Sequence, residues 1–205
     1  MDLTATTISV GYASGLNAYG TTLMLCLLAR AGIGDVPHDL TSDPILYGSG
    51  VMFLIEAVVD KIPYLDNAWD ALHTIIRPVI GSILGIQFAD ADGAASQVAA
   101  VGTAGSTALV SHTIKAGLRL GINVSPEPFS NFIVSTGEDI TAGAVSTLAV
   151  THPLIAISVV SVLLFAGITV VILLAKRIRR SVRNRRERRR RKREGLPPPD
   201  PPDPP

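Results

Sequence analysis

The sequence predicts an all-α protein, a multi-pass transmembrane bundle of about six helices, and three observations support this fold class. Hydrophobic residues make up 47% of the 205 residues, and mean hydropathy is positive. The two signs of charge are segregated, with most basic residues after residue 175 and most acids before it. Pro153 to Ala175 forms a run of 23 residues without a charge. About 20 apolar residues suffice for a helix to cross the hydrocarbon core, so this run predicts a membrane span.

The charge segregation predicts an orientation. The first 175 residues carry five basic residues against 13 acids, a net charge of −8, and the remainder carries 13 against four, a net charge of +9. Basic residues directly after an apolar run are typical of a cytoplasmic flank. We therefore predict a transmembrane domain over 1–175, a cytoplasmic polybasic juxtamembrane segment over 176–194, and a disordered, proline-rich tail over 195–205.

Five further apolar segments precede this run, each bounded by Gly, Pro or Asp turn signals. They carry polar residues and need neighbouring helices to shield them from lipid. With Pro153–Ala175 they make six predicted spans. The five are Gly11–Ala31, Pro44–Val59, Asn67–Phe88, Gln97–Leu120 and Phe129–Val150.

Loop charges support six crossings. The loop after the first segment, G-I-G-D-V-P-H-D-L-T-S-D, has three acids and no Lys or Arg, and A-D-A-D-G after the third is also acidic. Lys61 follows the second segment, and Lys115 and Arg119 end the fourth. Since basic loops stay in the cytoplasm, the sequence predicts an inner or plasma membrane protein with both termini cytoplasmic.

A weak internal repeat predicts two inverted three-helix halves, about 11–88 and 97–175. L-N-A-Y-G-T-T-L resembles G-T-A-G-S-T-A-L, and P-I-L-Y-G-S-G-V-M-F-L-I-E aligns with P-E-P-F-S-N-F-I-V-S-T-G-E, which pairs Glu56 with Glu138. A unit of three spans must re-enter the bilayer upside down, as in many secondary transporters. Chance similarity between apolar segments is the alternative.

The predicted spans contain charged residues at helical spacing, and a charge inside a bilayer needs a partner or water. Asp66, Asp70, His73 and Arg77 lie on one stripe of the third segment. We expect all such faces to converge in the bundle interior. The other faces are Glu56 with Asp60, then His112, Lys115 and Arg119, and finally Asn131, Ser135 and Glu138 with Asp139 beside them.

These faces predict an ion- or proton-coupled small-solute transporter or channel. Arg77 and Lys115 would receive an anionic group, while Glu56 and Glu138 would carry protons or cations, since a carboxyl group in low dielectric can exchange protons near neutral pH. Histidine suits a proton relay. The predicted pathway residues are Glu56, Asp70, His73, Arg77, His112, Lys115, Asn131, Glu138 and Asp139.

Two alternatives remain open. The buried charges could merely pair and fix helix register, which would suit a non-catalytic membrane scaffold or assembly factor. The basic groups could instead hold a phospholipid headgroup in a flippase or membrane enzyme. A metal site at Asp66, Asp70 and His73, with Glu56 as a fourth ligand, is disfavoured by Arg77 one turn away. The motifs H-E-x-x-H and G-x-S-x-G are absent. We predict no catalytic residue, metal or cofactor.

The polybasic segment predicts contact with anionic lipid headgroups through Lys176, Arg177, Arg179, Arg180 and Arg183. Each basic residue near the surface contributes about 1 kcal/mol to such binding. Nucleic acid is disfavoured because no aromatic or folded reader accompanies the charge. The sequence permits a homo-oligomer and does not identify the solute. Upstream, N-A-Y-G at Asn17–Gly20 is compatible with close helix packing or with a broken helix that lines a site.

Several stretches in this order resemble an uncharacterised family of integral membrane proteins, domain of unknown function 4126. They are G-L-N-A-Y-G-T, E-A-V-V-D-K-I-P-Y-L-D-N-A-W-D-A-L-H-T-I-I-R-P, S-H-T-I-K-A-G-L-R, N-V-S-P-E-P-F-S-N and G-E-D. The resemblance runs from about Gly11 to Ala175. It implies a multi-pass membrane protein and no established activity.

Overall fold

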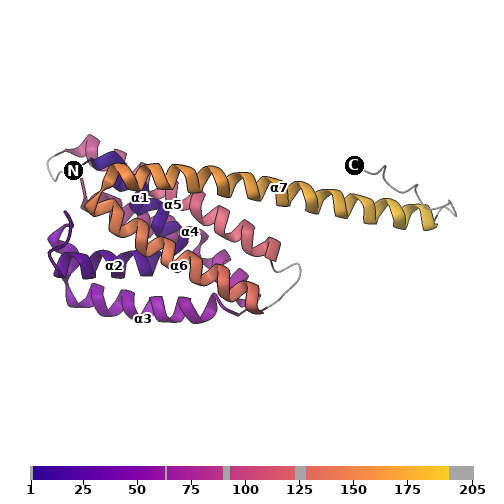
Figure 1. Ribbon diagram of the computed structural model, residues 1–205, viewed down its shortest axis with the longest axis horizontal. Coiled ribbons are helices and arrows are strands. Elements are labelled where there is room, and N and C mark those ends of the chain that lie inside the picture. Colours follow the sequence, from indigo (N-terminus) through magenta and orange to yellow (C-terminus); the bar gives the residue numbers. More distant parts are fainter. Residues whose placement is uncertain (1, 63, 90–92, 123–127, 194–205) are drawn as a thin grey trace.

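The computed structural model describes residues 2–62, 64–89, 93–122 and 128–193, and within these ranges the chain is helical with no β-strand (Figure 1). The predicted all-α class is confirmed. The elements are α1 (Leu3–Leu16), α2 (Ala18–Arg30), the short 3-10 helix η1 (His38–Thr41), α3 (Asp43–Val59), α4 (Leu65–Gln87), α5 (Ala94–Ile122), α6 (Pro128–Thr151) and α7 (Pro153–Arg193).

Helices α3 to α6 match the second to fifth predicted segments to within three residues at each end. Helix α7 begins at Pro153 as expected but continues for 41 residues, about 60 Å at 1.5 Å per residue. Residues 176–193 of the polybasic segment are therefore a helical extension of the apolar run, without a break at residue 176. The predicted disordered tail, 195–205, lies outside the described residues.

The first predicted segment is not one continuous helix. Helix α1 ends at Leu16 and α2 begins at Ala18, with Asn17 extended between them (φ −149°, ψ 99°). The Asn17 side chain accepts a hydrogen bond from the Gly20 backbone N–H (2.7 Å) and so caps α2. Asparagine is a favoured N-cap because its oxygen satisfies an otherwise unpaired N–H. The sequence N-A-Y-G therefore ends one helix and starts another.

The break reverses the chain, so that α1 and α2 form a hairpin with its tip at Asn17 (Figure 1). Near the start of α1, Thr6 donates to the Ala149 carbonyl (3.2 Å), and just beyond α2 the Asp35 N–H donates to the Val150 carbonyl (3.2 Å). Both ends of the hairpin thus lie beside the C-terminus of α6. The prediction of a continuous first span is wrong.

The hairpin also separates the chain ends. The beginning of α1 lies beside the beginning of α7, and the basic end of α7 projects from the opposite end of the bundle (Figure 1). The placement of both termini on one side depended on a first segment that runs through the bundle. The break at Asn17 removes that premise, and the side on which each terminus lies stays a prediction.

Helix α1 is the central helix and contacts α2, α4, α5, α6 and α7. Its small residues permit this: a Cβ on Gly11 would lie 2.3 Å from the Ala104 carbonyl oxygen of α5. A Cβ on Gly85 of α4 would lie 2.5 Å from the Ala104 Cβ. The three backbones therefore approach as closely as they do in small-residue membrane interfaces.

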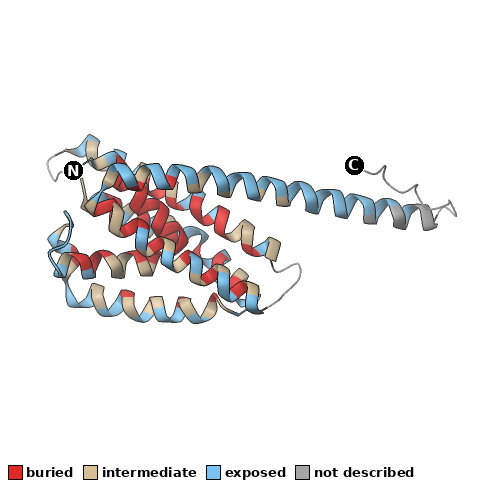
Figure 2. Ribbon diagram, in the orientation of Figure 1, coloured by how far each residue is buried: buried red, intermediate tan, exposed pale blue. Residues whose placement is uncertain are grey.

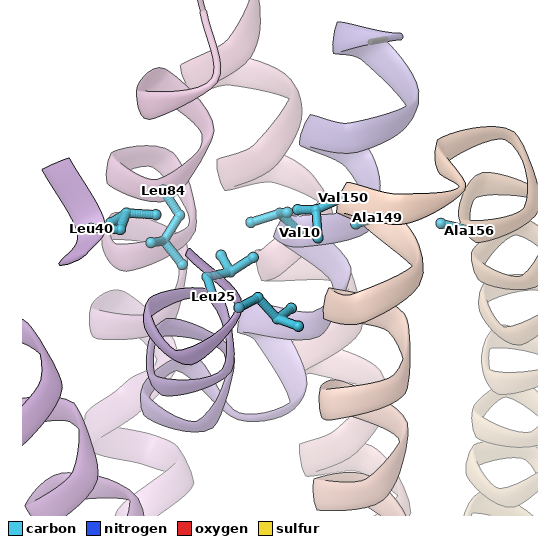
Figure 3. Packing of buried hydrophobic residues seen from close by; sticks show 8 residues of the cluster. Val10, Leu25, Leu40, Leu84, Ala149, Val150 and Ala156 are labelled. Atoms are coloured by element: carbon cyan, nitrogen blue, oxygen red, sulfur yellow. The ribbon is translucent and has the colours of Figure 1, made fainter. Parts of the chain in front are cut away.

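An apolar cluster fills the end of the bundle where the hairpin opens. Figure 3 shows Val10 of α1 and Leu25 of α2 near Leu84 and Val150, with Ala156 at the beginning of α7. These side chains are buried, and they tie α1, α2, α4, α6 and α7 together. This end of the bundle is fixed by shape and apolar contact.

Helix α7 differs from the rest. It is the one helix in the described ranges that is long and apolar enough to cross a membrane, over Pro153–Asn184. Almost none of its most apolar stretch is buried, and it is coloured as exposed over most of its length (Figure 2). A long apolar surface without protein neighbours is what lipid contact requires.

Candidate functional site: a buried ion network

The polar stripe of α4 faces the interior. Asp66, Asp70, His73 and Arg77 are each at most 2% exposed, whereas Ile75, on the opposite face of the helix, is 74% exposed. The helical spacing that predicted one common face is therefore confirmed. The stripe points at α3, α5 and α6, which bring the other predicted charged faces to it.

Arg77 is fully buried and connects α4 to three other helices. Its Nη2 lies 2.7 Å from Glu56 Oε1 on α3 and 3.2 Å from Asp70 Oδ1 on its own helix. Its Nη1 donates to the Gly15 carbonyl of α1 (3.2 Å). A charged hydrogen bond of this length is strong in a dry interior, and it satisfies a cation that would otherwise be costly to bury.

Lys115 of α5 lies at the centre of three carboxylates. Its Nζ is 2.7 Å from Asp60 Oδ2, 3.6 Å from Glu56 Oε1 and 3.5 Å from Glu138 Oε2. The two acids that the proposed repeat pairs, Glu56 and Glu138, therefore flank one ammonium group. Lys115 also donates to the Leu16 carbonyl (2.8 Å).

Arg119, one turn further along α5, contacts four acids. It hydrogen-bonds Asp60 Oδ2 (2.9 Å) and makes a short contact with Glu138. Asp66 and Asp70 lie farther from its guanidinium, at 3.7 and 3.9 Å. Because its fork of N–H groups reaches several helices at once, Arg119 ties α3, α4 and α6 to α5.

The break between α1 and α2 lies in this network. Ending α1 at Leu16 leaves the last carbonyls of that helix without partners inside it, and the helix dipole adds negative character there. Arg77 and Lys115 donate to the Gly15 and Leu16 carbonyls and so complete the helix end. The broken stretch proposed at Asn17–Gly20 does line the polar centre.

The edge of the network holds the remaining predicted pathway residues. Asn17 donates to Asp139 Oδ1 (2.8 Å), and Lys61 Nζ lies 4.0 Å from Asp139 Oδ2. Asn131 of α6 donates to Asp66 Oδ2 (3.2 Å). All nine predicted residues thus lie in or beside one cluster, where they connect α3, α4, α5, α6 and the tip of the hairpin.

The two histidines have defined hydrogen-bonding roles. Arg77 Nη1 lies 2.8 Å from His112 Nδ1, and since guanidinium only donates, His112 is neutral with its proton on Nε2. His73 Nδ1 donates to the Trp69 carbonyl (2.8 Å), and its Nε2 lies 3.1 Å from the Tyr19 hydroxyl. Trp69 stacks on the His73 ring, with centroids 4.4 Å apart.

The predicted pathway set left out three charged members of the network, Asp60, Asp66 and Arg119, although all three lie on the predicted stripes. The signal was present: Asp60 is four residues after Glu56, and Arg119 is four residues after Lys115. Tyr19 lies in the N-A-Y-G stretch that the sequence marked as a candidate lining of a site, but its pairing with His73 was not predicted, because His73 comes from a distant helix.

Across the described residues, no three His, Cys, Asp or Glu side chains are arranged to hold a metal ion. An open apolar groove of about 590 Å³ lies on the outer face between α4 and α5, and none of its ten lining residues belongs to the network. The centre of the network is closed, because the side chains of Arg77, Lys115 and Arg119 are fully buried.

The five predicted lipid-contacting residues of the tail are exposed on the extension of α7, remote from the network. Arg183 pairs loosely with Glu187 (3.8 Å) on the helix surface. The arrangement leaves this basic surface accessible to a partner. The residues are Lys176, Arg177, Arg179, Arg180 and Arg183.

The fold and site together define a class: an all-helical protein with charged side chains in a buried network and a terminal helix that is long and apolar enough for a membrane. The chain belongs to the family described as a domain of unknown function, DUF4126, whose model matches residues 4–172. This confirms the family resemblance. Searches of curated proteins and of solved structures found no match.

Proposed function

We propose that this chain is a multi-pass integral membrane protein whose buried ion network is the working centre of a proton- or ion-coupled small-solute transporter or channel. One observation carries the proposal. Charged side chains occupy the interior while large apolar side chains occupy the surface, the reverse of a soluble protein.

The apolar surface covers several helices besides α7. Exposed large side chains include Leu54 and Val58 on α3, Ile75 on α4 and Ile140 on α6. An apolar surface of this extent exceeds the isolated patches that monomeric soluble proteins leave open. In a bilayer the same residues face acyl chains, which supports α3 to α7 as five crossing helices.

The revised topology has five crossing helices and one hairpin, α1–α2, that enters and returns. It keeps every loop on its predicted side and moves only the N-terminus. Asp2 caps α1, Asp35 hydrogen-bonds to Val150 and Asp39 precedes the clustered Leu40, so all three acids lie at the end where the hairpin opens. The basic part of α7 lies at the other end (Figure 1). The positive-inside rule then gives an outer N-terminus and a cytoplasmic C-terminus in the plasma or inner membrane.

The helix directions are compatible with an inverted repeat of α2–α3–α4 and α5–α6–α7. Each helix of the first set runs opposite to its counterpart in the second (Figure 1). Glu56 on α3 and Glu138 on α6, the paired acids, approach Lys115 to 3.6 and 3.5 Å. A broken helix and central charges at a repeat interface are features of secondary transporters.

The exposed basic side chains of α7 support the proposed contact with anionic lipid. A helix that continues straight from the bilayer brings its first basic residues, Lys176 to Arg183, to the cytoplasmic surface. There the negative surface potential attracts them. The test uses the full chain, because the apolar part of α7 positions the basic residues at the membrane surface. In nanodiscs of mixed lipids, phosphatidylserine should be enriched around the protein.

The transport proposal is tested with the full chain in proteoliposomes that contain a pH-sensitive dye. A pH gradient is imposed in buffer alone, and then with added carboxylic acids, amino acids or phosphate. Wild type should collapse the gradient faster than empty vesicles. Glu56→Gln and Glu138→Gln should return the rate to that of empty vesicles, because each removes an ionisable group beside Lys115.

The matched control is Asp39→Asn, which neutralises an exposed acid outside the network and should transport like wild type. Thermal unfolding of each variant separates lost transport from lost folding. Deleting residues 176–205 should leave flux unchanged. Wild-type flux no faster than empty vesicles under every condition would refute transport, and it would favour the scaffold hypothesis, in which the ion pairs only hold helices in register.

A further inference from the structure

The hydrogen bonds of the network distinguish one carboxyl group from the others. We propose that Asp70 holds an exchangeable proton, and that the proton is the ion coupled to transport. The first part concerns the resting protein alone, and the second rests on the proposed function.

The network contains more acids than cations. Among the described residues, five carboxyl groups and three cations share contacts of 4.0 Å or less, and none of their side chains is more than 10% exposed. The peripheral pair of Lys61 and Asp139 balances itself. Uncompensated negative charge is costly to bury, and the usual resolution is uptake of a proton. The acids are Glu56, Asp60, Asp66, Asp70 and Glu138.

Three of the acids are matched one to one by the cations. Glu56 takes the closest contact of Arg77 (2.7 Å), and Asp60 that of Lys115 (2.7 Å). Glu138 takes the closest contact of Arg119. Each of these three carboxylates accepts a charge-assisted hydrogen bond, which favours its ionised form. Asp66 and Asp70 remain.

Asp66 has the partners of an ionised carboxylate. It lies in the first turn of α4, where the helix dipole favours negative charge. Its Oδ1 accepts from the Asn67 backbone N–H (2.7 Å), and its Oδ2 accepts from the Asn131 amide (3.2 Å).

Asp70 has none of these partners. Its side chain is 3% exposed, and neither carboxyl oxygen accepts a hydrogen bond. Arg77 and Arg119 lie 3.2 and 3.9 Å away, but the hydrogen bonds that they donate to carboxylates go to other acids. An ionised carboxylate leaves several acceptor sites unsatisfied here, whereas a protonated one is neutral and loses less on burial.

Asp70 lies 3.2 Å from Arg77 and 3.9 Å from Arg119, and these two cations connect it to the charged and titratable groups of the network, so its proton is coupled to them. A change at Asp70 is therefore felt by the cations that also contact α1, which links proton exchange to the hairpin tip. The groups of the network are Glu56 on α3 and Asp60 directly after it, Asp66, His73 and Arg77 on α4, His112, Lys115 and Arg119 on α5, Glu138 on α6, and Tyr19 on α2.

Infrared spectroscopy of the full chain in nanodiscs tests the inference, because a protonated carboxyl group has a C=O stretch separate from that of a carboxylate. Wild type at neutral pH should show this band. Asp70→Asn should lose it, while Asp66→Asn and Glu56→Gln should keep it. Asp70→Glu should retain a band at a shifted frequency, which covers the case in which the asparagine variant fails to fold.

The outcomes separate the two proposals, since the infrared readout requires no transport. Loss of the band in Asp70→Asn together with loss of proteoliposome proton flux supports both. If Asp70→Asn loses the band but wild type shows no proton flux, protonation of Asp70 is upheld and coupling to transport is refuted. A band that persists in Asp70→Asn, that does not shift in Asp70→Glu, or that is absent from wild type overturns the assignment.

Discussion

Helices α1, α4 and α5 pass through two regions held together by different forces. Towards the hairpin's open end they meet through glycine and alanine, with backbones almost in contact at Gly11 and Ala104. Towards the hairpin tip the same helices are joined by Arg77, Lys115 and Arg119. Shape complementarity does not respond to protons or ions, whereas an ion network does. We infer that the bundle has a rigid frame at one end and a chemically responsive centre next to it.

The largest effect is expected from Arg119→Gln. This substitution removes the cation shared by Asp60 and Glu138 and leaves buried carboxylates without charge compensation. Breaking a buried pair costs about 3–5 kcal/mol. Denaturant unfolding in micelles measures the loss in free energy of unfolding. The control is Arg183→Gln on exposed α7, where an i,i+4 pair contributes about 0.3–0.5 kcal/mol. Equal stability of the two variants would show that the network does not hold the helices together.

A smaller effect is expected from Gly11→Ala in the close-packed region. The added Cβ would lie 2.3 Å from a backbone oxygen, so α1 and α5 must separate. Overpacking of this kind costs about 1–3 kcal/mol. Gly102→Ala on α5 is the matched control, because no atom lies within 4 Å of its Cβ position. In thermal unfolding, the midpoint temperature should fall for Gly11→Ala and not for Gly102→Ala, at every pH tested. An unchanged midpoint for Gly11→Ala would contradict the close backbone contact.

The smallest effect is expected from Asn17→Ala at the tip of the hairpin, beside the ion network. The variant loses the cap to Gly20 and the hydrogen bond to Asp139. Loss of an N-cap costs about 0.5–2 kcal/mol. Ser42→Ala provides the comparison, since Ser42 precedes α3 without a side-chain cap and should cost less. Amide hydrogen exchange should rise around residues 16–21 in Asn17→Ala; protection equal to wild type would show that the cap does not maintain the break.

Much of the site followed from helical spacing. The stripe of Asp66, Asp70, His73 and Arg77 is decided by residues on a single helix, and its inward orientation follows from the cost of exposing charge to lipid. The helices α3 to α6 likewise follow from apolar runs between turn signals. Inferences within one helix were reliable because the period of 3.6 residues fixes which side chains share a face.

The direction of the chain after Asn17, and the pairing of each acid with a cation, were predicted less completely. A single asparagine between two apolar stretches does not by itself show whether the chain continues or turns back, and the hairpin became visible only from hydrogen bonds to α6. The sequence drew attention to Glu56 and Glu138 as proton carriers. The structure matches both with cations and leaves Asp70 without hydrogen bonds, a difference that depends on distances between four helices.

The amino-acid sequence alone determined that this protein is helical, that its charges lie on narrow stripes, and that its last helix suits a membrane, since composition and periodicity act locally. Only the tertiary structure decided that the first segment folds back at Asn17, and which acid is matched by which cation. Both depend on contacts between residues far apart in the chain, where ångström differences in position determine which hydrogen bonds form.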